Sequence, residues 1–269
     1  MYPIANPTTN PSERTYTTEL SKGQGAISET LTLLDVWDPG MGTQELTERV
    51  MESGGLGRST ETRTRDLVTR VFGRRYLTCD ERPARVLQRL QDPLPLSKLR
   101  QFMLVFTARQ HDILHDFTTN VYWPKYEAGA EKIHRSDAET FIEEAHALGI
   151  INPGWSEAMI VRVARYLTGT LADFGLLEDS RQSSRQIQPV YISNELILYL
   201  AHEVHFDGYS DNSVLDHPDW ALFGLGQEDI VQALKRVSYD GHFIVQYSGE
   251  LLRISWTYES MEECLNAIA

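Results

Sequence analysis

Apolar residues recur at intervals of three and four along most of the chain, which predicts helices rather than strands. The clearest case precedes Tyr76, where Leu67, Val68, Val71 and Phe72 form one stripe. Proline and glycine steps such as Asp38-Pro39-Gly40 end these segments. Helices are expected at residues 26–37, 44–51, 59–76, 80–90, 96–117, 136–149, 156–174, 194–206, 227–237 and 259–269.

Two pairs of consecutive helices have the spacing of a helix-turn-helix. In the first pair, Gly54-Gly55-Leu56-Gly57 separates the helices, and Ser59 is expected to cap the second one. The second pair spans Asp137 to Phe174, with a capping box at Ser136 and Glu139. The segment from Leu176 to Ser193, strand-like from Ile187 to Ile192, is expected to be a wing or a linker.

The pattern changes near the C-terminus. Residues 242–247 and 251–257 are rich in β-branched and aromatic residues and flank a Ser248-Gly249 turn, which predicts a hairpin. The expected fold is therefore mainly α: a helical globular protein with two helix-turn-helix-like units and a small C-terminal β-hairpin. We divide it into a tail (1–15), a basic helical region (16–120), a second helix-turn-helix-like region (121–193) and an acidic α+β region (194–269). Tyr122-Trp123-Pro124 marks the junction between the second and third parts.

Charge is distributed unevenly along the chain. Between Arg58 and Arg109, twelve basic residues face five acidic ones, so this segment carries +7 and the remainder −20, within a total of −13. From Val190 onward, three basic residues face thirteen acidic ones. Because binding depends on the local field, the basic segment can still hold a polyanion.

The candidate binding residues lie on the two predicted second helices. Arg63, Arg70 and Arg74 fall within an arc of about 40° on an ideal helix, beside the apolar stripe. Such a row can contact phosphates, provided that it forms a common outer ridge and is not paired with internal carboxylates. A solvated face paired with the acidic remainder of the chain is the alternative. The full set of candidates is Arg58, Ser59, Thr60, Arg63, Arg70 and Arg74, with Arg162 and Arg165 as a weaker second site.

The sequence offers little for catalysis. His111 and His115 lie four residues apart, a spacing that can hold a metal ion, but they lack the zincin order His-Glu-x-x-His, and no Gly-x-x-x-x-Gly-Lys-Ser/Thr loop occurs. We therefore expect neither an enzyme, a metal nor a cofactor. Two distant cysteines, Cys79 and Cys264, favour a reducing cytoplasm, and no apolar run approaches the length of a membrane span.

Several short segments resemble one protein family. They are Tyr16 to Gly23, Arg58-Ser59-Thr60, Trp155-Ser156 through Leu177, Asp219 to Leu225, and Ile254 to Tyr258 with Met261-Glu262-Glu263. Together they resemble the BrxA family of the bacterial BREX phage-exclusion systems, over nearly the whole chain.

The resemblance implies a small, mainly helical, non-enzymatic protein that carries helix-turn-helix elements and binds double-stranded DNA; we expect it to be a monomer. Its partners would include a DNA methyltransferase, an ATPase and a phosphatase-like BREX protein. The family's basic surface would fall on Arg58, Arg63, Arg70 and Arg74, with Arg162 and Arg165 for the second motif. Two alternatives stay open: an RNA binder, because the family has been likened to NusB, and an assembly scaffold whose acidic C-terminal part docks a basic partner.

Overall fold

The structure is a computed structural model and describes residues 15–57, 59–249 and 251–269. Its first part is helical, and a π-helical segment joins two α-helices into one run from Glu61 to Tyr76. The elements of this part are η2 (Glu19–Lys22), α1 (Ile27–Val36), α2 (Thr43–Ser53), α3 (Glu61–Asp66), η3 (Leu67–Phe72), α4 (Gly73–Tyr76) and α5 (Arg82–Leu90).

The middle of the chain combines helices with a small sheet. Strands β1 and β2 pair antiparallel, with Ile133 opposite Arg185. The elements are α6 (Leu96–Ala108), α7 (Asp112–Phe117), η4 (Thr118–Tyr122), α8 (Trp123–Glu127), β1 (Lys132–His134), α9 (Arg135–Ala147), α10 (Glu157–Asp173) and β2 (Ser184–Gln186).

The C-terminal part ends in the predicted hairpin, followed by a short helix. Its elements are α11 (Asn194–Phe206), η5 (Asp211–Val214), η6 (Pro218–Phe223), α12 (Gln227–Ser238), β3 (Phe243–Ser248), β4 (Leu251–Trp256) and α13 (Met261–Ile268). Strands β3 and β4 pair antiparallel, with Val245 opposite Ile254. The prediction of a mainly helical fold with a C-terminal hairpin is confirmed.

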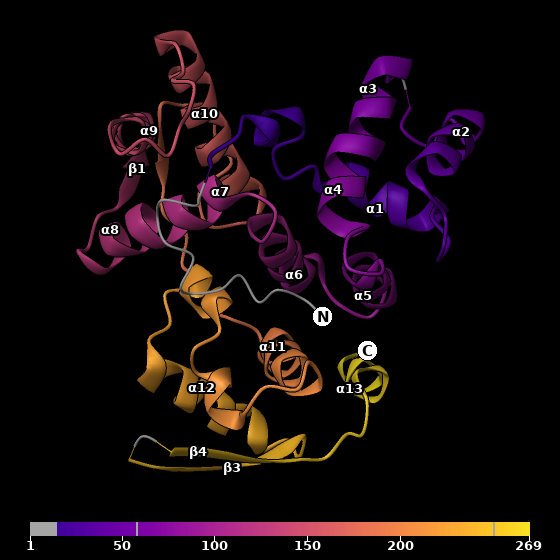
Figure 1. The fold of residues 1–269 in the computed structure, drawn as a ribbon, viewed down its shortest axis with the longest axis vertical. Coiled ribbons are helices and arrows are strands. Elements are labelled where there is room, and N and C mark those ends of the chain that lie inside the picture. The colour runs from indigo at the N-terminus through magenta and orange to yellow at the C-terminus, as the bar shows by residue number, and fades with distance from the viewer. Residues whose placement is uncertain (1–14, 58, 250) are drawn as a thin grey trace.

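One hydrophobic core connects all three parts. Phe102 and Phe106 of α6 pack on Tyr199 of α11, with ring centres 5.5 and 5.9 Å apart. Figure 1 shows α6 and α11 near the middle, with α1 to α5 on one side, α9 and α10 on another, and the hairpin at the far end. No helix in the described part of the chain is both long and apolar enough to cross a membrane.

The single helix predicted at 96–117 is wrong, because the chain breaks between Ala108 and Asp112. The side chain of Arg109 turns inward to Glu203, and this long-range ion pair gave no local signal in the sequence. The junction predicted at Tyr122-Trp123-Pro124 is also wrong: α7, η4 and α8 form one helical run. Proline lacks an N–H, and a π-helical turn just before it tolerates the missing hydrogen bond.

Three local predictions also need correction. Thr60, and not Ser59, caps the helix at 61, since its Oγ1 accepts a 3.2 Å hydrogen bond from the Arg63 N–H. At α9, the Asp137 carboxylate accepts from the His134 N–H at 2.8 Å, in place of a Ser136 and Glu139 capping box. The strand predicted at 187–192 lies instead at 184–186, where it pairs with β1 next to the start of α9.

Candidate nucleic-acid interface

The helical run from 61 to 76 buries one stripe and exposes another, as predicted. Leu67, Val68, Val71 and Phe72 are buried, and Thr60 fixes the start of the run. Arg63, Arg70 and Arg74 are exposed on the outside. Their angular spacing departs from that of an ideal α-helix, because the π-helical segment η3 lies between Arg63 and Arg74. Arg58 lies outside the described residues.

These arginines lie beside η2, the short helix at 19–22. The Arg63 guanidinium donates to the backbone carbonyl of Lys22. Arg74 lies 3.4 Å from the Glu19 carboxylate, and Arg70 lies 3.6 Å from Asp66. The ridge is therefore partly paired with carboxylates: Asp66 is a local partner four residues before Arg70, whereas only the fold brings Glu19 to Arg74.

The pairs are too exposed to hold the arginines tightly. The side chains of Arg70 and Arg74 are 49% and 59% exposed. Exposed ion pairs of this kind typically contribute only about 0–1 kcal/mol, since water screens both charges. A phosphate oxygen can therefore replace either carboxylate at small cost.

The second candidate site lies on α10. Arg162 and Arg165 are exposed, and no ion pair to either side chain is found among the residues that the structure describes. The Arg165 guanidinium lies 5.4 Å from the ring centre of Tyr166. Ser156 caps this helix, as predicted, by accepting from the Met159 N–H. These two arginines are the least neutralised of the predicted residues that the structure describes.

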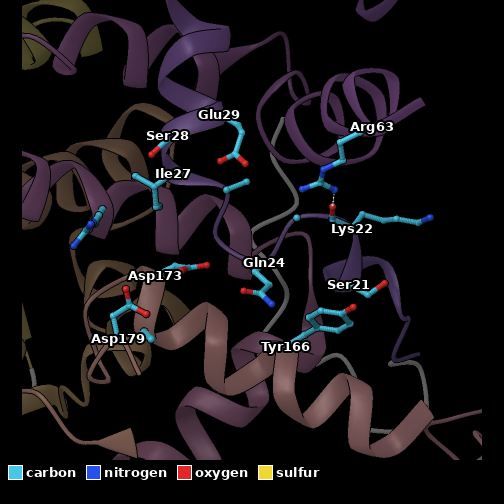
Figure 2. A pocket seen from close by; sticks show the side chains of 14 residues that line it. Ser21, Lys22, Gln24, Ile27, Ser28, Glu29, Arg63, Tyr166, Asp173 and Asp179 are labelled. Carbon is cyan, nitrogen blue, oxygen red and sulfur yellow. Dashed lines mark hydrogen bonds between the residues drawn. The ribbon is translucent and has the colours of Figure 1, made fainter. Parts of the chain in front are cut away.

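A pocket of about 510 Å³ lies between the two candidate helices. Figure 2 shows Arg63 and Lys22 on one side and Tyr166 and Asp173 on the other. The sequence did not predict that α3 and α10 lie on either side of one pocket, because the two helices are about a hundred positions apart and no local pattern indicates their proximity. The pocket places Arg63 and the neighbour of Arg165 around one depression of the surface.

The pocket's charges are balanced. It is lined by three cations, Lys22, Arg63 and Arg100, and by three carboxylates, Glu29, Asp173 and Asp179. Burial raises the pKa of Asp173, which also accepts a hydrogen bond from the Gly25 N–H. The pocket is therefore not selective for an anion, and the exposed arginines around it remain the stronger candidates for phosphate contact.

Three members of the basic segment do not contribute to this surface. Arg75 is buried, with one guanidinium nitrogen 3.4 Å from the Gly25 carbonyl, and burial lowers its pKa. Arg82 bonds Asp207 at 3.0 Å. Arg109 is bonded to Glu203 and to Asp219. The nominal +7 of the segment thus overstates its outward charge.

The histidine pair considered as a metal site is not arranged for one. His111 is 4% exposed, and burial, followed by the charges of Arg75 and Arg74, lowers its pKa to about 3. His115 bonds the carboxylate of Asp116. Across the described ranges, no group of three or more histidine, cysteine, aspartate or glutamate side chains has the arrangement of a metal site.

Comparison with known proteins places most of the chain in one family. The family model that matches is BrxA, over residues 14–204. A crystal structure of an uncharacterized protein from Magnetospirillum magneticum is similar in fold, with a TM-score of 0.56 and 16% sequence identity, covering 71% of this chain and 94% of that one. No curated protein matches.

Proposed function

Since the chain belongs to the BrxA family, which associates it with the BREX phage-defence systems, we propose that it is a non-catalytic component that binds double-stranded DNA. The protein contacts mainly the phosphate backbone of the DNA. It acts in the cytoplasm. The observation that carries this proposal is the pair of exposed arginine rows, on the helix at 61–76 and on α10, two helices that contribute Arg63 and Tyr166 to one pocket.

Two helix-turn-helix-like units present these rows. The first unit consists of α2 and the run from α3 to α4, and the second consists of α9 and α10. In each unit a turn joins the two helices, and the second helix buries its apolar stripe against the core. A DNA-binding helix-turn-helix uses the outer face of its second helix in this way. The residues proposed to contact DNA are Ser59, Thr60, Arg63, Arg70, Arg74, Arg162 and Arg165, with Arg58.

Arginine and threonine suit phosphate oxygens as well as base edges. The exposed rows lack the asparagine and glutamine pairs that read adenine, so shape and charge recognition is favoured over strict sequence preference. The ion pairs with Glu19 and Asp66 orient Arg74 and Arg70 until a phosphate replaces the carboxylates.

The test is a mobility shift of a short duplex across a salt series. With four phosphate contacts, log K falls with log salt at a slope of about −3.6, and the double variant Arg70→Glu/Arg74→Glu flattens the slope by about half. Arg253→Glu, the same type of substitution at one exposed site on β4, is the control for each single variant, Arg70→Glu and Arg74→Glu. A salt-independent affinity, or tighter binding of duplex RNA at equal ionic strength, contradicts the proposal.

We also propose that the protein acts beside other BREX components, including a methyltransferase, an ATPase and a phosphatase-like protein. The acidic character from Val190 onward favours a scaffold role for this part. Co-purification of truncated halves of the chain with those components separates the two roles. Loss of the partners without loss of DNA binding assigns the two activities to different parts of the chain.

A further inference from the structure

The C-terminal part has the element order of a winged helix. Helix α11 is followed by the short helices η5 and η6, a turn, helix α12 and the hairpin of β3 and β4. Helix α12 contacts both α11 and β3, so these elements form one unit (Figure 1). In a DNA-binding winged helix, the helix in the position of α12 enters the major groove.

The charge of this unit argues against DNA. Residues 194–269 hold thirteen acidic and three basic side chains, and among the acidic ones Glu203, Asp207 and Asp219 are bonded to Arg109 or Arg82. Glu228 and Asp229 are exposed in the first turn of α12, where a recognition helix would meet the bases. Two carboxylates there repel the phosphate backbone. The same charge attracts a basic polypeptide.

The two edges of the hairpin differ. Along β4, the Leu252 N–H donates to the Asn212 side chain at 2.8 Å and the Ile254 N–H to Asp211 at 2.9 Å. These two residues of η5 occupy the place of a third strand and protect that edge. The indole of Trp256 donates to the same aspartate at 3.2 Å.

The edge of β3 has no such cover. Because backbone groups alternate in direction along an antiparallel strand, those of Val245 and Tyr247 point away from β4. Within the described ranges, no hydrogen bond to the backbone groups of these two residues from outside the hairpin is found. The strand, Phe-Ile-Val-Gln-Tyr-Ser, carries no charge and no proline, the features that usually block pairing at an edge. Ile244, on its outer face, is 64% exposed.

This edge lies outside the part that matches the family. The matching model covers residues 14–204, and α12 and the hairpin follow that stretch. A surface that is open and acidic is suited to a basic partner.

We propose that the free edge of β3 binds a basic, extended segment of a partner protein, which adds to the hairpin as a third strand. Main-chain hydrogen bonds to Val245 and Tyr247 supply affinity, and the exposed carboxylate of Asp240, three residues before β3, favours lysine and arginine. A second copy of this chain is disfavoured as the occupant, because two surfaces of the same negative sign would meet. The proposal is independent of DNA binding by the arginine rows.

The test pans a phage-displayed library of random peptides about 12 residues long against the full chain. Enriched peptides are expected to be basic, with basic residues alternating with β-branched residues. One enriched peptide, synthesised, is expected to slow hydrogen exchange at the Val245 and Tyr247 amides. Val245→Pro removes an outward N–H that the hairpin does not use, so it is expected to abolish binding while retaining the circular dichroism spectrum and the duplex DNA affinity.

A second variant, Asp240→Lys, leaves the strand intact and is expected to weaken peptide binding about five-fold. Several results would overturn the proposal: no enrichment, enrichment of acidic or uncharged peptides, protection elsewhere, or binding that Val245→Pro leaves unchanged. Concentration-dependent dimerisation abolished by Val245→Pro would assign the edge to a second copy, and competition by duplex DNA would assign it to nucleic acid; either outcome also overturns it.

Discussion

The backbone N–H of Gly25 donates a 2.8 Å hydrogen bond to the carboxylate of Asp173, 148 positions away. This hydrogen bond ties the loop before α1 to the end of α10. Behind it lies the buried side chain of Arg75, whose guanidinium reaches the Gly25 carbonyl. The two helix pairs that we propose to contact DNA are thus joined at one backbone position with no room for a side chain.

Gly25→Ala is expected to weaken the contact between the loop before α1 and the end of α10. A Cβ at Gly25 would lie 2.4 Å from the Asp173 Cβ, so the loop must move. We expect the free energy of unfolding to fall by about 1–3 kcal/mol, measured by urea denaturation. Gly42→Ala is the control, because its Cβ meets no atom within 4 Å, and an equal decrease in both variants would contradict the account.

His111 is expected to make the protein sensitive to acid. Its pKa is lowered from 6.5 to about 3, so below pH 6.5 the unfolded chain binds a proton that the folded chain does not. The stability that His111 contributes is therefore present above pH 6.5 and declines as the pH falls towards 3, by about 2 kcal/mol at pH 5. His111→Leu should reduce the pH dependence of unfolding in this window, measured by urea denaturation across the pH range.

Arg109 is expected to be a structural residue. Its guanidinium bonds Glu203 at 3.1 Å and Asp219 at 2.8 Å, and both carboxylates are buried. Arg109→Met leaves two buried negative charges without this partner and should cost about 3–5 kcal/mol in thermal or urea unfolding. Arg253→Met, at an exposed site, should change stability by less than about 0.5 kcal/mol.

The two cysteines should differ in reactivity. Cys79 is exposed, whereas Cys264 is buried, and burial raises the pKa of its thiol to about 12. Because the thiolate is the reactive form, a thiol reagent should modify Cys79 at once and Cys264 only after unfolding. Cys79→Ser should remove the fast phase, and a fast phase that persists would show that Cys264 is accessible.

The arginines of α10 are expected to contribute to the salt dependence of DNA binding. Arg162 and Arg165 are exposed, and removing one phosphate-binding arginine should reduce the slope of log K against log salt by about 0.9. Arg162→Glu/Arg165→Glu should therefore make the slope of log K against log salt less negative by about 1.8 in the same mobility-shift series. An unchanged slope with an intact fold would confine the interface to the helix at 61–76.

Local patterns predicted most elements because they depend on neighbours in sequence. The apolar stripe from Leu67 to Phe72 and the turn at Ser248-Gly249 report on the chain within a few residues. Two failed predictions concerned caps displaced by a position or two, at Thr60 and at His134 with Asp137. The break between Ala108 and Asp112 lies beside Arg109, whose partner Glu203 is 94 positions away.

The amino-acid sequence by itself determined a mainly helical protein with a basic first part, an acidic last part and a closing hairpin, since periodicity, turn residues and charge are properties of neighbouring positions. Only the tertiary structure decided which arginines are available. Folding buries Arg75, pairs Arg109 internally, and sets Arg74 beside Glu19. The tertiary structure also decided that η5 covers the β4 edge of the hairpin while the β3 edge stays open. Contacts between distant segments form only when the chain has closed around its core.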